Sequence, residues 1–177
     1  MGTVQKNRSP RKLNQQKNKT IMTNCNCNFR NGADSPDFLI TSPTAGVYVL
    51  GLTHNTCGCR KMALNDPARP VIANLSVAAV GEPIDVGNAM YCQECLVSGT
   101  VTYCPCGSCE PRTEYVSYQC CLPCTSATQP TLTLGEVKAS PKPIRYYINN
   151  GCGCCQGTKP CTNQIAITTS IEVTAGA

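Results

Sequence analysis

The sequence contains no tryptophan, two phenylalanines and one histidine, and no run of about eighteen apolar residues. With a single histidine and ten acidic side chains, few groups are present for general acid–base catalysis. No transmembrane helix is predicted. No apolar segment of about seven residues follows the basic N-terminus, as a secretory signal peptide would require. We therefore expect a protein that is not an enzyme, holds no cofactor and has no membrane span.

Cysteine is abundant instead: sixteen cysteines make up about 9 % of the chain. Such a content indicates either a disulfide scaffold or a metal protein. A chain of 177 residues can bury a sufficient core without cross-links. The cysteines are therefore expected to serve durability or assembly.

The net charge of +5 is unevenly distributed. Residues 1–20 contain six Lys or Arg and no acid, whereas the rest of the chain contains nine basic and ten acidic side chains. The polar first segment cannot bury enough surface to order itself, which predicts a flexible arm over residues 1–30 followed by one domain over residues 31–177. The body has no basic excess and no nucleic-acid-reading motif, so nucleic acid is not expected as a partner.

From Asp37 onward the pattern predicts β-strands. DFLITS and GVYVLGLT are separated by a Pro- and Gly-containing turn, and the segments 69–80 and 165–173 alternate between apolar and polar residues. Shorter strands are expected near residues 101–103, 115–118, 132–134 and 144–148. No window shows helical periodicity. The predicted fold is all-β, an antiparallel jelly roll or β-sandwich.

Two cysteine spacings are compatible with a zinc site. Cys92, Cys95, Cys106 and Cys109 form C-x2-C-x10-C-x2-C, and Cys106, Cys109, Cys121 and Cys124 form C-x2-C-x11-C-x2-C. Four thiolates on two such knuckles suit tetrahedral zinc. The intervening loops are short, and the two candidates share a pair, so at most one can exist.

The C-x-C pairs indicate a different role. In an extended strand residues i and i+2 lie about 6.6 Å apart on one face, near the upper limit for a disulfide between them. Cys25 and Cys27 are therefore better placed to bond two separate sulfurs, and the same reasoning applies to Cys57/Cys59, Cys104/Cys106 and Cys152/Cys154. His54 is close to Cys57 in sequence, but a polar loop histidine is the expected role.

The chain has a basic arm, then the segment IMTNCNCNFR, then a cysteine-rich β body. This layout resembles that of the subunits of endospore appendages, which are disulfide-linked spore-surface fibres. In that family a jelly-roll body is joined to other subunits by an N-terminal connector. The resemblance implies that Cys25 and Cys27 are interchain disulfide donors. It also implies an extracellular protein on the spore or cell surface, released by mother-cell lysis rather than by a signal peptide.

The sequence thus predicts a structural subunit that assembles with copies of itself through strand contribution, with an anchoring spore-surface protein as a further partner. The acceptors are expected among six cysteines, without a choice between them: Cys104, Cys106, Cys109, Cys152, Cys154 and Cys155. The alternatives are a zinc-stabilised binding module with a basic tail, using Cys92, Cys95, Cys106 and Cys109, and a monomeric disulfide-rich adhesin.

Overall fold

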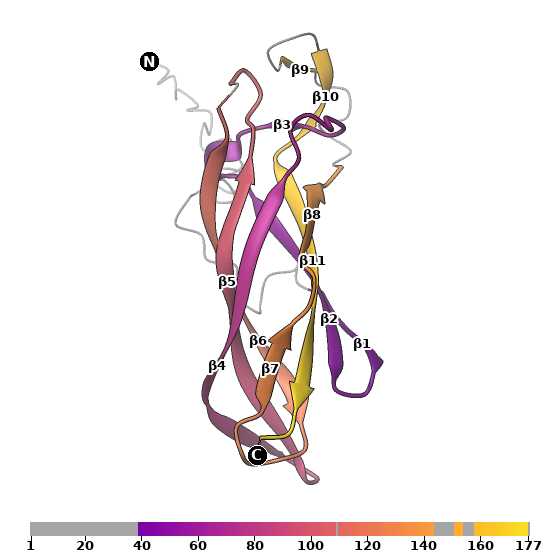
Figure 1. The fold of residues 1–177 in the computed structure, drawn as a ribbon, viewed down its shortest axis with the longest axis vertical. Helices are drawn as coiled ribbons and strands as arrows, with labels where there is room; N and C mark the ends of the chain where they lie inside the picture. The colour runs from indigo at the N-terminus through magenta and orange to yellow at the C-terminus, as the bar shows by residue number, and fades with distance from the viewer. Residues whose placement is uncertain (1–38, 109, 144–150, 154–157, 177) are drawn as a thin grey trace, which may run out of the picture.

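The computed structural model describes residues 39–108, 110–143, 151–153 and 158–176, which form antiparallel β-sheets with no α-helix (Figure 1). A three-stranded sheet consists of β4 (Ile72–Gly87), β5 (Met90–Tyr103) and β6 (Arg112–Cys124), in that order. These are the three longest strands in the described part of the molecule, and each pairs with the next one along the chain.

The second main sheet is built around the C-terminal strand. β11 (Gln164–Thr174) pairs on one side with β2 (Val47–Asn55), which pairs in turn with β1 (Leu39–Thr44). On its other side β11 pairs with β7 (Thr131–Leu134) and β8 (Lys138–Pro141). A small sheet of β3 (Met62–Ala63), β10 (Thr158–Thr162) and β9 (Gly151–Gly153) extends one end, near the 3-10 turn η2 (Cys57–Cys59).

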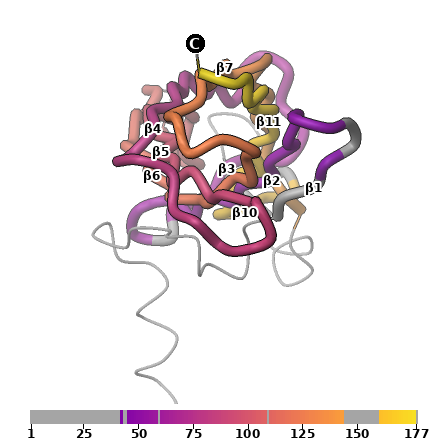
Figure 2. Tube along the Cα trace, turned by 90° about the horizontal axis from the view of Figure 1, so that it is seen from below, coloured from indigo at the N-terminus to yellow at the C-terminus, as the bar shows by residue number. Residues whose placement is uncertain are grey.

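The two main sheets face each other and enclose the core (Figure 2). Because side chains alternate along a strand, each strand places every second residue inward. The inner face of β11 contributes Ile165, Ile167 and Ile171, all fully buried, and β5 contributes Val97 and Val101 opposite them. Burial of these branched side chains stabilises the sandwich by about 1.5–3 kcal/mol each.

One side of the sandwich is closed and the other is open. β4 lies next to β7 and β8, so that edge of the three-stranded sheet is covered. β6 pairs only with β5, and β1 pairs only with β2, among the residues that the structure describes. Within the described part of the chain, the thirteen-residue strand β6 therefore has one edge without a strand partner, on the side where β1 is also an edge strand.

The all-β sandwich predicted from the sequence is confirmed, and the jelly-roll topology stays a prediction. The alternation of residues 71–79 is confirmed: Val71, Ala73, Leu75, Val77 and Ala79 are less exposed than their neighbours. The strands expected near 101–103 and 115–118 are much longer than predicted, because polar residues continue both. The basic arm and the strand predicted at residues 144–148 lie outside the described residues.

Candidate functional site

Cysteines lie at both ends of the β5–β6 hairpin. The strands pair in register from Tyr91–Cys124 at one end to Tyr103–Arg112 at the other, a span of about 40 Å at 3.3 Å per residue. We call the first the hairpin end, because the tight turn between β4 and β5 lies there. We call the second the thiol end, because Cys104 lies there directly after β5. Each end has its own sulfur chemistry.

At the hairpin end a disulfide joins Cys92 of β5 to Cys121 of β6, with their Cα atoms 5.7 Å apart. Both residues lie on the outer face of the sheet, diagonally across the strand pair. Cys121 is exposed and Cys92 is buried. This bond covalently joins two neighbouring strands of the same sheet.

On the inner face beside this disulfide lie three reduced cysteines: Cys95, Cys120 and Cys124. Cys95 and Cys120 are directly opposite in the strand register, and their thiols hydrogen-bond each other. The hydrogen bond to Cys120 and burial raise the pKa of Cys95 far above that of an ordinary thiol. Because the thiolate is the nucleophilic form, Cys95 is unreactive while the core is closed.

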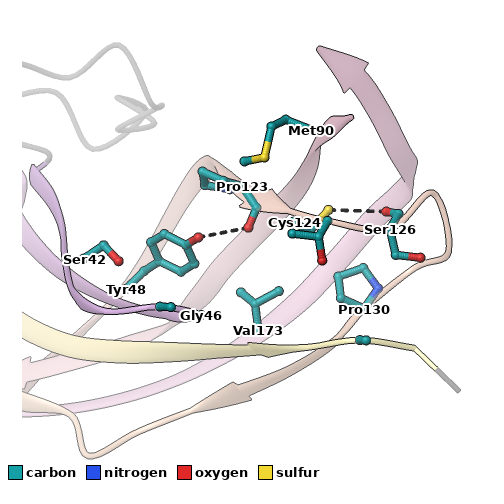
Figure 3. Close-up of a pocket in the computed structure, with 12 residues that line it drawn as sticks. Ser42, Gly46, Tyr48, Met90, Pro123, Cys124, Ser126, Pro130 and Val173 are labelled. Atoms are coloured by element: carbon teal, nitrogen blue, oxygen red, sulfur yellow. Dashed lines mark hydrogen bonds between the residues drawn. The ribbon is translucent and has the colours of Figure 1, made fainter. Parts of the chain in front are cut away.

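A pocket of about 300 Å³ opens at the hairpin end, between the β1–β2 turn and the end of β6 (Figure 3). Its lining is largely apolar and includes Tyr48, Met90, Val173 and the buried Cys124. The Tyr48 hydroxyl donates a 3.0 Å hydrogen bond to the Pro123 carbonyl, which links β2 of the second main sheet to β6 of the three-stranded sheet. Partial burial, with a smaller effect from Cys124, raises the pKa of Tyr48.

The thiol end contains the described members of the predicted acceptor set. Cys104 immediately follows β5, is partly exposed and has a reduced thiol. Cys106 is in a disulfide, its amide donates to the Lys61 carbonyl at 2.7 Å, and it packs against Ala63 and Cys161. An open cleft of about 600 Å³ beside Cys106 is lined also by Arg60, Lys61 and Arg112. Cys104 is thus the described acceptor candidate with an available thiol.

The remaining predicted residues lie outside this description. Cys25, Cys27, Cys109, Cys154 and Cys155 fall outside the described residues. Cys152 lies in β9 opposite Lys159 of β10, but its side chain is not described. The predicted donors and all six predicted acceptors therefore stay predictions.

Two expectations about cysteine geometry are corrected. Cys92 is in a disulfide and Cys95 points to the opposite face of β5, so the two do not form the C-x2-C knuckle of the zinc alternative. Within the described residues no group of His, Cys, Asp and Glu could hold a metal ion. Cys57 and Cys59 lie in the 3-10 turn η2, with Gly58 at φ 66°, and not in the extended conformation assumed for C-x-C pairs.

His54 is not a loop residue, as expected from the sequence, but lies buried near the end of β2. Its Nε2 donates to Glu114 Oε2 at 2.7 Å, and the Tyr103 hydroxyl donates to Glu114 Oε1 at 2.6 Å. The Cys57 amide donates to both oxygens, at 3.1 and 3.0 Å, and Arg112 Nε lies 3.3 Å from Oε1. Glu114 of β6 therefore joins both sheets and the η2 turn.

This carboxylate cluster could not be found by motif, because its members are 60 and 11 residues apart from Glu114. The available signal was a glutamate at an inward position of an alternating strand.

Burial alone would raise the pKa of Glu114, but the hydrogen bonds from His54, Tyr103 and the Cys57 amide together hold this pKa at about 2. Burial and the hydrogen bond to Glu114 raise the pKa of Tyr103.

The cluster predicts an acid-sensitive fold. A carboxyl group whose pKa is lower in the folded state stabilises that state above its ordinary pKa, and this contribution is lost on acidification. As the pH falls from 4.5 to about 2, we expect the free energy of unfolding to decrease by about 3 kcal/mol from Glu114 alone. Urea unfolding at a series of pH values measures this. The variant Glu114→Gln, which has no carboxyl to titrate, should lose that part of the pH dependence; an unchanged profile would contradict the assignment.

In the part of the chain that is described, no helix is long and apolar enough to cross a membrane. Comparison with known proteins gave no match, whether with a family model, a curated protein or a solved structure.

Proposed function

We propose that this protein is a structural subunit that assembles with copies of itself into a disulfide-linked fibre or layer. The observation that carries the proposal is the arrangement of the thiol end. There, the reduced and partly exposed Cys104 lies at the same end as Arg112, the first residue of β6, whose outer edge has no strand partner among the described residues.

The unpaired edge supports assembly by strand contribution. An exposed strand edge presents backbone N–H and C=O groups that an extended segment of another chain can pair with. β6 is long enough for such an addition, since a segment the size of residues 21–30 would pair with most of its thirteen residues. Pairing along β6 would bring such a segment to the level of Cys104.

The difference between the two ends supports growth in one direction. The thiol end carries Cys104 and an open cleft, whereas the hairpin end carries an apolar pocket. A contact between unlike ends is heterologous, and it generates a filament when the rotation between copies does not close a ring. We therefore favour a fibre over a closed dimer.

The covalent step joins a donor cysteine of one copy, Cys25 or Cys27, to Cys104 of another. Each thiol gives up its hydrogen, one S–S bond forms, and a low-molecular-weight disulfide takes up the two electrons and two protons as two thiols. Cys106 is already in a disulfide, so it could accept a donor only by exchange. We place this assembly outside the cell, on the spore or cell surface, where such bonds persist.

Replacing both donors, in the variant Cys25→Ser/Cys27→Ser, should leave the domain folded and abolish boil-resistant assemblies. Cys104→Ser should reduce the same cross-linked fraction. Electron microscopy and boiled gels without reductant measure both effects. The control Asn26→Ser/Asn28→Ser changes the same segment but keeps its sulfurs, and should assemble like the wild type. Intact boil-resistant fibres from the double cysteine variant would overturn the donor role.

A further inference from the structure

The β5–β6 hairpin carries two cysteine pairs near the same level but on opposite faces of the sheet. The outer pair, Cys92 and Cys121, is bonded. The inner pair, Cys95 and Cys120, is reduced, is 1 % and 4 % exposed, and is directly opposed in the strand register. The Cys95 thiol donates to the Gln93 carbonyl at 3.3 Å.

We propose that Cys95 and Cys120 form a second, buried disulfide, so that β5 and β6 are joined on both faces of the sheet. Directly opposed residues of an antiparallel pair have Cα atoms about 4.5 or 5.5 Å apart, and a disulfide tolerates about 4.4–6.8 Å. The backbone therefore accommodates the bond in either type of pair. The bond lies within one chain and does not depend on the proposed assembly.

The register selects this pair over the other buried thiol of β6. Cys124 also faces inward, but it is opposite Tyr91 and four residues beyond Cys120. Four residues correspond to about 13 Å along a strand, which is outside the range of a disulfide with Cys95. Cys95 and Cys120 are therefore each other's partners.

The reaction consumes one equivalent of a small disulfide such as oxidised glutathione. One thiol of the pair, as thiolate, attacks the oxidant and releases one glutathione; the second then attacks the mixed disulfide and releases the other. Both thiols are buried, so an oxidant in solution does not reach either of them in the closed sandwich. The bond forms while the hairpin folds or when it opens. Once formed it resists reductants that reach the exposed Cys121.

The test uses a background in which the outer bond is absent, Cys92→Ala/Cys121→Ala. The full-length variant is unfolded in urea, reduced, refolded with oxidised glutathione, and alkylated; tryptic peptides are then analysed without reductant. Cleavage after Arg112 separates Cys95 from Cys120, so their bond appears as a cross-linked peptide pair. We expect this pair to be lost on adding Cys95→Ala or Cys120→Ala and to be kept on adding Cys124→Ala. Failure to detect a Cys95–Cys120 pair after refolding would overturn the proposal.

The wild-type protein provides a second measurement, should the double variant fold poorly. After refolding under the same oxidant, mild reduction of the native protein should make the exposed Cys121 available for alkylation, while Cys95 and Cys120 stay unlabelled until the chain is both unfolded and reduced. Alkylation of Cys95 and Cys120 after unfolding without reductant would show that they are still thiols, and would contradict the second bond.

Thermal stability distinguishes the bonds as well. Cys92 and Cys121 already close the loop between the strands over a separation of 29 residues, so a second closure of nearly the same loop constrains the unfolded chain little further. Oxidation of the inner pair should therefore raise Tm by several degrees in the Cys92→Ala/Cys121→Ala background but only slightly in the wild type. Equal shifts in both proteins would contradict this account of the pair.

Discussion

Replacing Glu114 with alanine is expected to lower the free energy of unfolding by about 3–5 kcal/mol, the loss typical of breaking a buried ionic network. The variant leaves the buried His54 and Tyr103 side chains without their acceptor, and it also removes the acceptor of the Cys57 amide. Because these groups belong to both sheets and the η2 turn, the loss weakens the contact between the layers and the order of the thiol end. Urea unfolding near neutral pH measures the change.

Two further variants make the interpretation specific. Glu114→Gln keeps the size and one acceptor oxygen and should cost less than Glu114→Ala, since part of the hydrogen bonding survives. Glu172→Ala removes an exposed carboxylate of β11 and should change the free energy by less than about 0.5 kcal/mol. A cost below about 1 kcal/mol for Glu114→Ala would show that the cluster does not hold the sheets together.

Replacing Gly99 with alanine is the second change with a large expected effect. Gly99 of β5 lies opposite Leu75 of β4, and a Cβ at this position would overlap the carbonyl oxygen of Asn74 and approach Leu75 Cα to 2.9 Å. Both obstacles are backbone, so the two strands must move apart in the middle of their pairing. We expect a loss of about 3 kcal/mol, at the upper end of the cost of overpacking. Thermal unfolding followed by circular dichroism measures it.

Gly135→Ala is the matched control. Its Cβ would meet mainly the hydroxyl of the Ser170 side chain, which can rotate away, so the expected loss is about 1 kcal/mol or less. Similar losses for the two variants would contradict the close approach of β4 and β5 as the cause, because the reduced backbone entropy of the unfolded chain favours both alanine variants equally.

The sequence predicted the strands better than their arrangement. Alternation is a local property, so the inward faces of β4 and β11 could be read directly from Leu75, Val77, Ile165 and Ile167. The position of β11 between β2 and the β7 and β8 strands depends on pairings between residues far apart in the chain, such as Ile165 with His54. No local pattern encodes those pairings.

The same limit applies to the site. Cysteine spacing indicated cross-linking but could not identify Cys121 as the partner of Cys92, because that choice follows from the register of β5 and β6. His54 was expected in a loop because its polar character is visible in the sequence, while the glutamate that allows its burial is 60 residues away. The inward position of Glu114 next to Tyr115 and Val116 was a readable signal that the prediction did not use.

Covalent assembly of copies is the central claim, and a denaturing gel of native material tests it most directly. Samples are alkylated to trap thiols, boiled, and run with and without reductant. Material that stays at the top of the gel until reductant converts it to a band near the chain mass of 18.9 kDa is the result that the proposal predicts. A single band near that mass in both lanes would contradict it and favour the monomeric adhesin.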